Sequence, residues 1–321
     1  MSAAQAWSLA ATLAVAAILA GIGGELFVRA VVGMAERWRM SKLLVAMTIA
    51  ACATSAPEMM VAVVASANGN SALAMGGALG SNVTNLMLIL GVALLFGSMT
   101  ARMDELRWHL AAVLAAPLAA FALLADGMLS RWEGALLLLA FSAWLVFTVI
   151  SIQRTRGLAT ETPDPGAARH PLALLCQLAG GVATLVVAGH LFVEGGRTMA
   201  HLFGVPESII GATVVALGTS MPELMTTLVA RWRGQQDVGL GTLLGSNLFN
   251  GLAILGTAAL IAPVDAPRLA TWGMLLFGLF AVLLVIPRGD SLGRGRGGLL
   301  LVSYAMYVAV LGWAPGFHDA G

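Results

Sequence analysis

Long apolar segments separated by short polar loops run through the chain from end to end. A helix needs about 20 predominantly apolar residues to cross a bilayer, and ten segments reach or approach this length. The pattern therefore predicts an all-α integral membrane protein with ten transmembrane helices. The predicted helices are residues 8–33, 43–67, 72–97, 108–125, 132–153, 171–197, 208–230, 238–262, 269–286 and 298–314.

Four of these apolar segments contain short polar motifs that repeat at a constant spacing. ATSAPE at 53–58 returns as GTSMPE at 218–223, and GSNVTN at 80–85 returns as GSNLFN at 245–250, both displaced by 165 residues. Carboxylates and amides inside a membrane are costly, and they usually mark functional sites. The repeat therefore predicts two related halves that hold a cation within the membrane.

One extended polar segment near the middle of the chain separates the two halves. It divides the sequence into a first five-helix repeat at 1–153, a cytoplasmic linker at 154–170 and a second five-helix repeat at 171–321. Because five is an odd number, the second half enters the membrane from the side opposite to the first. We therefore expect inverted repeats, which place a substrate site near the middle of the membrane between broken helices.

Composition agrees with a membrane protein, and the basic residues indicate its orientation. Apolar residues make up 59% of the chain and charged residues 10%. Most of the 17 Lys and Arg residues lie in the loops after helices 1, 3, 5, 7 and 9, and short basic loops stay in the cytoplasm. We expect both termini outside, in a bacterial-type inner (plasma) membrane. The net charge of +1 gives no reason to expect nucleic acid.

The first motif of each half places oxygen-bearing groups on one helix face, because residues at i, i+3, i+4 and i+7 lie on the same side of a helix. These residues are Ala51, Thr54, Ser55 and Glu58 in helix 2, and Ala216, Thr219, Ser220 and Glu223 in helix 7. Pro57 and Pro222 lack the amide hydrogens that helical geometry requires. Each helix is therefore predicted to kink or open beside its Glu, which exposes carbonyl oxygens.

The second motif adds hydroxyl and amide groups on the neighbouring helices, at Ser81, Asn82, Asn85, Ser246, Asn247 and Asn250. Calcium binds about six to eight oxygens. Two bidentate Glu side chains supply about four oxygens, and carbonyl groups near Thr54 and Thr219 bring the number to about six. The two carboxylates also balance the double charge of the ion. We expect no cofactor: the partners are transported cations and the lipid bilayer, and the oligomeric state stays open.

Structural roles and other functions are alternatives to this interpretation. Ser, Thr, Asn and Pro residues also serve to join and shape membrane helices, so a structural role stays open for each single residue of the motifs. The chain has neither H-E-x-x-H nor G-x-S-x-G, so we expect no enzyme. Its single lysine, Lys42, lies in a loop, which excludes a Schiff-base pigment. A passive cation channel is the alternative from a different functional class.

Three further features concern isolated side chains within the apolar segments. The Glu25 and Arg29 pair, and the Glu194 and Arg197 pair, have helical spacing and are predicted to neutralise each other. His190 corresponds to Glu25 in the repeat. The two cysteines, Cys52 and Cys176, have no metal-like spacing and are predicted to be small buried residues.

At these motifs the chain resembles the cation/calcium exchanger superfamily, whose two repeats carry G-T-S-x-P-E/D and G-S-N-x-x-N/D. The resemblance implies antiport of Ca²⁺ against Na⁺, or against H⁺ as an alternative, by alternating access, with helices 1 and 6 sliding across a core of helices 2, 3, 7 and 8. It implies calcium ligands at Glu58, Glu223 and the backbone oxygens of Thr54 and Thr219. It implies sodium ligands at Ser55, Ser81, Ser220, Ser246 and the carbonyl groups near Ala51 and Ala216, while Asn85 and Asn250 match the last motif position.

The chain also departs from the family pattern at two positions that matter here. Some members, including potassium-dependent exchangers, have Asp at the position of Asn250, so the Asn argues against potassium coupling. The first copy has Ala53 where the family usually has Gly. The sequence leaves the counter-ion, the stoichiometry and the direction of transport open.

Overall fold

The computed structural model describes residues 3–100, 103–155, 170–202, 216–266, 268–287, 289 and 291–313. Most of the predicted linker and the first part of the predicted seventh helix, residues 208–215, lie outside the described residues. Segments of π-helix are labelled η. The helices of the first half are α1 (Ala3–Trp38), α2 (Lys42–Val45), η1 (Ala46–Ala50), α3 (Ala51–Thr54), α4 (Ala56–Ala67), α5 (Ser71–Val83), η2 (Thr84–Ile89), α6 (Leu90–Leu95), α7 (Met103–Leu123) and α8 (Arg131–Thr155).

The second half repeats this order of elements. Its helices are α9 (Pro171–Leu202), α11 (Ala216–Thr219), α12 (Met221–Trp232), α13 (Gln236–Leu248), η5 (Phe249–Ile254), α14 (Leu255–Ile261), α15 (Arg268–Val285) and α16 (Arg294–Trp313). The bounds of α11, α12, α13 and η5 are those of α3, α4, α5 and η2 displaced by 165 residues. The spacing of the motifs in the sequence is therefore also the spacing of the helices.

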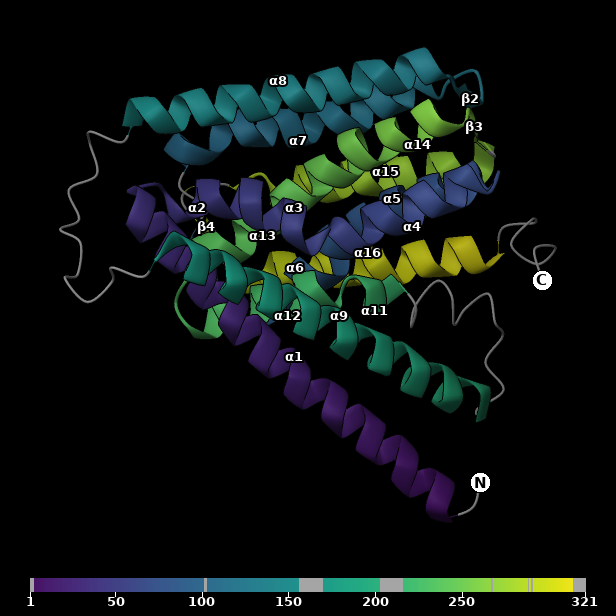
Figure 1. Ribbon diagram of the computed structural model, residues 1–321. Coiled ribbons are helices and arrows are strands. Elements are labelled where there is room, and N and C mark those ends of the chain that lie inside the picture. The colour runs from purple at the N-terminus through teal and green to yellow at the C-terminus, as the bar shows by residue number, and fades with distance from the viewer. Residues whose placement is uncertain are drawn as a thin grey trace.

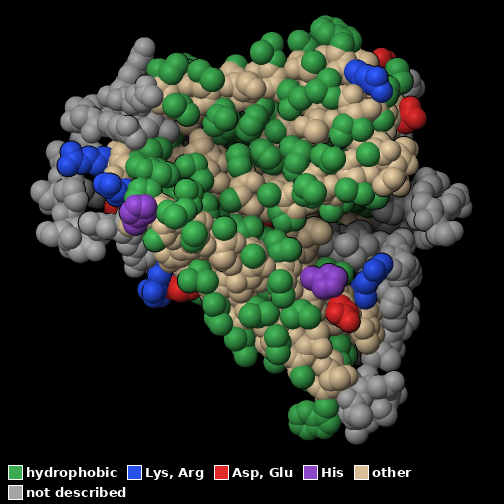
Figure 2. Space-filling model, in the orientation of Figure 1, with side chains coloured by type: hydrophobic (Ala, Val, Ile, Leu, Met, Phe, Trp, Pro, Cys, Tyr) green, Lys and Arg blue, Asp and Glu red, His purple; other side chains and the backbone are tan. Residues whose placement is uncertain are grey.

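Six helical spans within the described residues are individually long and apolar enough to cross a membrane, and α1, α8 and α9 supply three of them. A seventh is the broken pair Lys42–Thr54 and Ala56–Ala67, which bends by 44°. On the face of the molecule in Figure 2, charged side chains gather at the two ends, and the band between them is largely apolar. This distribution suits a protein whose middle lies in hydrocarbon.

Two minimal strand pairs join the loops of one half to the loops of the other. β1 (Met99–Thr100) pairs antiparallel with β4 (Ser291–Leu292), and β2 (Met128–Leu129) pairs antiparallel with β3 (Val264–Asp265). The two pairs lie at opposite ends of the helices (Figure 1). Because β1 and β3 are themselves 165 residues apart, the two pairs are related by the repeat. The rest of the described structure is helical, as the sequence predicts.

The helices form a tilted pair that lies against a compact bundle. α1 and α9 run side by side and slant away from the other helices, and α7 and α8 lie on the opposite side of the bundle (Figure 1). The approach of α1 to α9 is close, because a Cβ on Gly23 would lie 3.0 Å from the carbonyl oxygen of Gly181. The broken helices that carry the motifs lie between these two layers. α1 begins, and α16 ends, on the same side of the molecule (Figure 1).

The prediction that both cysteines are buried was wrong. Cys52 is half-buried and Cys176 is exposed on the surface of α9. On an apolar helix such as α9, a small apolar thiol is tolerated at the surface.

Candidate functional site

Each of the two motif helices is interrupted where the sequence predicts. Ser55 and Ser220 separate the helices on either side of them, with φ and ψ of −88° and 7° for Ser55 and −88° and 14° for Ser220. Pro57 and Pro222 follow in the first turn of the next helix, where a missing N–H group is tolerated. The break leaves backbone carbonyl groups beside Glu58 and Glu223. Such irregular backbone within a membrane occurs where it is buried in protein or lines a cavity.

The carboxyl group of Glu223 is buried between residues of both halves. Its Oε1 atom accepts hydrogen bonds from Ser55 Oγ and from Ser246 Oγ, each at 3.1 Å. Ser246 Oγ also lies 3.3 Å from Thr54 Oγ1. Glu223 is only 1% exposed, and its Oε2 atom has no hydrogen-bond partner among the described residues. One carboxyl oxygen is therefore held in place by two hydroxyl groups, while the other has no hydrogen-bond partner among the described residues.

Glu58 occupies the related position in the first half but has fewer contacts. Its side chain is half-buried, and its Oε2 atom is shielded from solvent without a hydrogen-bond partner in the described structure. The carboxyl group interacts electrostatically with that of Glu223. Two carboxylates that repel each other in a poorly solvated place are costly unless a cation balances their charge or a proton neutralises one of them.

The amides of the second motif connect the two halves. Asn82 Nδ2 donates to the backbone oxygen of Asn247, and Asn247 Nδ2 donates to the backbone oxygen of Asn82, both at 3.2 Å. Asn85 Nδ2 donates to Asn247 Oδ1 at 3.2 Å. The Oδ1 atoms of Asn85 and Asn250 are buried and unpartnered within the described chain. The sequence drew attention to Asn82 and Asn247 but did not reveal their reciprocal bonds, although both occupy the same position in the repeat.

The π-helical segments at these asparagines were not predicted. Asn85 lies in η2 and Asn250 lies in η5. A π-helical turn inserts an extra residue into the helical repeat and is frequent at functional sites. No single residue type predicts a π-helical turn. The only sequence feature that marks these two turns is the equivalent position of Asn85 and Asn250 in the repeat.

The remaining predicted residues differ in burial between the two halves. Ser81 and Ser220 are buried, and Ser220 Oγ has no partner in the described structure. The carbonyl oxygen of Ala51 accepts bonds from Thr54 Oγ1 at 3.2 Å and from the Ser55 amide at 3.0 Å. For Ala216 the structure describes the backbone only. Thr54 is fully buried, whereas Thr219 is exposed.

Within the described residues, no three His, Cys, Asp or Glu side chains gather at one point as they would in a site built from charged ligands. The site instead combines two carboxyl groups with hydroxyl, amide and backbone oxygens. This hard, all-oxygen set suits calcium or sodium rather than a transition metal.

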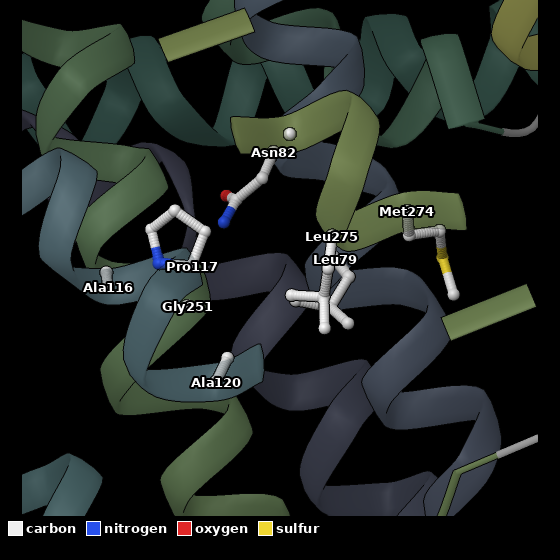
Figure 3. A pocket seen from close by; sticks show the side chains of 9 residues that line it. Leu79, Asn82, Ala116, Pro117, Ala120, Gly251, Met274 and Leu275 are labelled. Atoms are coloured by element: carbon white, nitrogen blue, oxygen red, sulfur yellow. The ribbon is translucent and has the colours of Figure 1, made fainter. Parts of the chain in front are cut away.

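A small cavity lies beside Asn82, on the side that faces α7 and α15 (Figure 3). Its lining is apolar apart from Asn82 and consists otherwise of Leu79, Ala116, Pro117, Ala120, Gly251, Met274, Leu275 and Gly278. An apolar lining cannot replace the hydration shell of an ion. The cavity therefore offers a single polar side chain, that of Asn82.

The sequence profile described as "Sodium/calcium exchanger protein" matches residues 8–150 and 173–313, which is most of the chain. The chain belongs to the sodium/calcium exchanger family. The two matched segments begin 165 residues apart, as the motifs do. Members of this family are cation antiporters, so the chain is a transporter and not an enzyme.

Two relatives match the sequence of this sodium/calcium exchanger family protein over most of its length. It is 35% identical over 286 residues to Inner membrane protein YrbG of Escherichia coli, which covers 84% of this chain and 86% of YrbG. It is 26% identical over 333 residues to Sodium/calcium exchanger MaX1 of Methanosarcina acetivorans, with 90% and 94% coverage.

A solved structure of a relative confirms the fold. The sodium/calcium exchanger from Methanococcus jannaschii superposes with a TM-score of 0.76 at 25% identity, and the match covers 94% of this chain and 97% of that one. The predicted architecture of ten transmembrane helices in two inverted repeats is thereby confirmed, as is an integral membrane protein.

Proposed function

We propose that this protein exchanges Ca²⁺ for Na⁺ across a membrane by alternating access, with Glu58 and Glu223 as the central calcium ligands. The observation that carries the proposal is the presence of one carboxyl group at each of two symmetric helix breaks, each with a buried Oε2 atom that has no partner among the described residues. Two negative charges match a divalent cation. The backbone oxygens of Thr54 and Thr219 complete the set, because calcium accepts carbonyl ligands beside carboxylates.

The same site offers neutral oxygens that suit sodium. Ser55, Ser81, Ser220 and Ser246 carry the hydroxyl groups, and the carbonyl groups of Ala51 and Ala216 stand one turn earlier on the motif helices. Asn85 and Asn250 contribute buried Oδ1 atoms. Ser55 and Ser246 also donate hydrogen bonds to Glu223, so the proposed sodium ligands and the proposed calcium ligand are in direct contact, and the two ions compete for one place. Competition for one set of ligands is what exchange requires.

The two halves, residues 1–153 and 171–321, act in this proposal as the paired repeats, with both termini outside a bacterial-type inner membrane. The structure of the Methanococcus jannaschii relative was also studied after soaking with 10 mM Na⁺ and 10 mM Sr²⁺. Strontium is a divalent cation with ligand preferences like those of calcium. A relative examined with one monovalent and one divalent ion supports the same ion pair for this chain.

Transport into proteoliposomes tests the ion pair. Vesicles loaded with sodium and diluted into sodium-free buffer are expected to accumulate calcium, because sodium leaving down its gradient drives calcium inward. A pH gradient imposed without sodium should leave calcium uptake at the level of protein-free vesicles. Uptake driven by the pH gradient alone would instead support a proton antiporter, and calcium movement that needs no counter-ion would support a channel.

Protons should weaken calcium binding, because a carboxylate must be deprotonated to bind a metal. We expect the apparent calcium affinity of the purified protein to fall as the pH is lowered from about 8 to about 5, toward the range in which Glu takes up protons. Isothermal titration at constant ionic strength measures this. The Glu36→Gln variant is a suitable reference, since Glu36 is an exposed residue near the C-terminal end of α1, outside the motifs. Affinity that stays constant over this range contradicts the assignment of Glu58 and Glu223.

Replacing Asn250 by Asp is expected to keep the site but change its preference among ions. A third carboxylate beside Glu58 and Glu223 adds negative charge, which strengthens the attraction of additional monovalent cations. Calcium uptake should then become more sensitive to inhibition by sodium or potassium added on the calcium side. Inhibition curves identical to those of the wild type would show that Asn250 lies too far from the ions to act as a ligand.

A further inference from the structure

The tilted helices α1 and α9 touch different parts of the bundle, although the repeat relates them to each other. A Cβ on Gly24 of α1 would lie 2.9 Å from Val229 Cγ2 and 3.2 Å from the backbone oxygen of Met225, so α1 covers this face of α12. The repeat assigns Gly189 of α9 to the matching face of α4, at Met60 and Val64. Those two residues are instead 62% and 53% exposed.

Gly189 lies against α11, where its Cβ would come within 2.4 Å of the backbone oxygen of Gly218. The structure is therefore one of two arrangements that an inverted repeat allows. In the exchanged arrangement, α9 covers α4 at Met60 and Val64, and α1 leaves α12 and approaches Ala53 of α3. Alternating access consists of passing between two such arrangements.

We propose that this protein is biased toward the arrangement seen here, with α12 covered and α4 open, by two local departures from its own repeat symmetry. The proposal rests on the proposed function, since it concerns the conformations between which an alternating-access exchanger moves. Its elements are an ion pair between α1 and the end of α12, and a steric conflict at Ala53. Each follows from comparing residues of one half with the residues 165 positions away in the other half.

The ion pair joins the tilted helix to the bundle. Arg233, at the end of α12, donates from Nε to Glu25 Oε2 at 2.8 Å, and its second nitrogen contacts Glu25 Oε1. The predicted pairing of Glu25 with Arg29 is confirmed, so Glu25 lies between two guanidinium groups. The bond to Arg233 must break when α1 leaves α12. The bond to Arg29 lies within α1 and moves with it.

The exchanged arrangement has no equivalent ion pair. His190 and Asn68 occupy the repeat positions of Glu25 and Arg233. Asn68 already donates from Nδ2 to the backbone oxygen of Val64 in its own helix, at 2.9 Å. A carboxylate with a bidentate guanidinium is thus replaced by an imidazole opposite an amide, which is a much weaker partner. This difference stabilises only the arrangement with α12 covered.

The steric conflict acts in the same direction. Gly218 lies so close to α9 that a Cβ there would be 2.0 Å from Val193 Cγ2. The repeat positions of Gly218 and Val193 are Ala53 and Val28. When α1 approaches α3 in the exchanged arrangement, the real Cβ of Ala53 meets Val28 where glycine would leave room. The backbone must then give way by a small amount, which disfavours that arrangement.

A cysteine at position 229 reports the exchanged arrangement directly. Val229 is buried here, and it becomes accessible when α1 leaves α12. In a protein with Cys52→Ala and Cys176→Ala, Val229→Cys should react slowly with a membrane-impermeant maleimide applied on the side where α12 ends. Glu25→Gln and Arg233→Gln should each raise this rate about two- to fivefold, the effect of one partly exposed ion pair.

Three further variants separate a shift in conformation from local loosening. Arg29→Gln removes only the bond within α1 and should leave the rate unchanged. Arg233→Lys keeps the charge and should restore most of the protection. Ala53→Gly acts away from Val229 and should still raise the rate, because it relieves the exchanged arrangement.

Sodium-driven calcium uptake is measured in the same vesicles, so that failure of the proposed exchange function can be distinguished from failure of the proposed conformational bias. Absence of exchange in the parent protein rejects the proposed function. Exchange together with unchanged labelling in Glu25→Gln overturns the bias. If Arg29→Gln raises the labelling rate as much as Glu25→Gln does, the ion pair is only a local contact and the bias is overturned. The bias is also overturned if Ala53→Gly does not raise the labelling rate.

Discussion

Replacing Glu223 by glutamine is expected to abolish calcium transport while leaving a folded protein. The amide keeps the shape of the side chain, and its oxygen can still accept from Ser55 and Ser246. It removes half of the negative charge that balances calcium in a poorly solvated place. Loss of one partner from a buried charge pair costs about 3–5 kcal/mol, so calcium affinity should fall by about a hundredfold or more.

Glu58→Gln should have a comparable effect, because in the proposed site the two carboxyl groups share one ion. Initial rates of calcium uptake at matched protein content measure both, with Glu36→Gln as the control that removes an exposed carboxylate. Folding is checked separately by gel filtration in detergent. Calcium uptake near the wild-type rate in either site variant, with the protein incorporated normally, would falsify the assignment.

Gly245→Ala is expected to prevent stable assembly of the bundle. A Cβ at Gly245 would lie 2.1 Å from the backbone oxygen of Met47 and 2.6 Å from the Cβ of Ala51. Because the obstacle is backbone, neither helix can relieve it by rotating a side chain. The helices must separate, and we expect a loss of at least about 3 kcal/mol, at the upper end for overpacking.

Gly80→Ala is the matched control, since Gly80 is the repeat partner of Gly245. The nearest atom to its added Cβ is the Tyr307 hydroxyl at 3.6 Å, which is an ordinary contact. The yield of monodisperse protein and its melting temperature in detergent should drop sharply for Gly245→Ala and change little for Gly80→Ala. Equal behaviour of the two variants would show that α13 does not approach η1 and α3 as closely as described.

The sequence predicted the architecture because two simple signals agreed. The apolar segments set the number of helices, and the 165-residue spacing of the motifs set the relation between the halves. Pro57 and Pro222 indicated the breaks, since a proline within a long helix cannot donate to the carbonyl group four residues earlier. These features follow from residue types that act locally, so they can be seen without knowing which helices touch.

The parts that were missed depend on contacts between distant segments. Thr54 and Thr219 look equivalent in the sequence, yet one is fully buried and the other exposed. A sequence motif is symmetric, whereas any single conformation of an alternating-access protein is not. The bonds from Ser55 and Ser246 to Glu223, and that from Arg233 to Glu25, likewise require the packed structure. The exposure of Cys176 depends on which face of α9 turns to lipid.

The reciprocal bonds between Asn82 and Asn247 have a consequence for motion. Each amide donates to the other residue's backbone oxygen, so exchanging the two halves converts the first bond into the second. The pair is therefore the same before and after the halves swap their roles, and no bond in it has to break. If the protein works by alternating access as proposed, the pair can serve as a fixed point between α5 and α13 while α1 and α9 move.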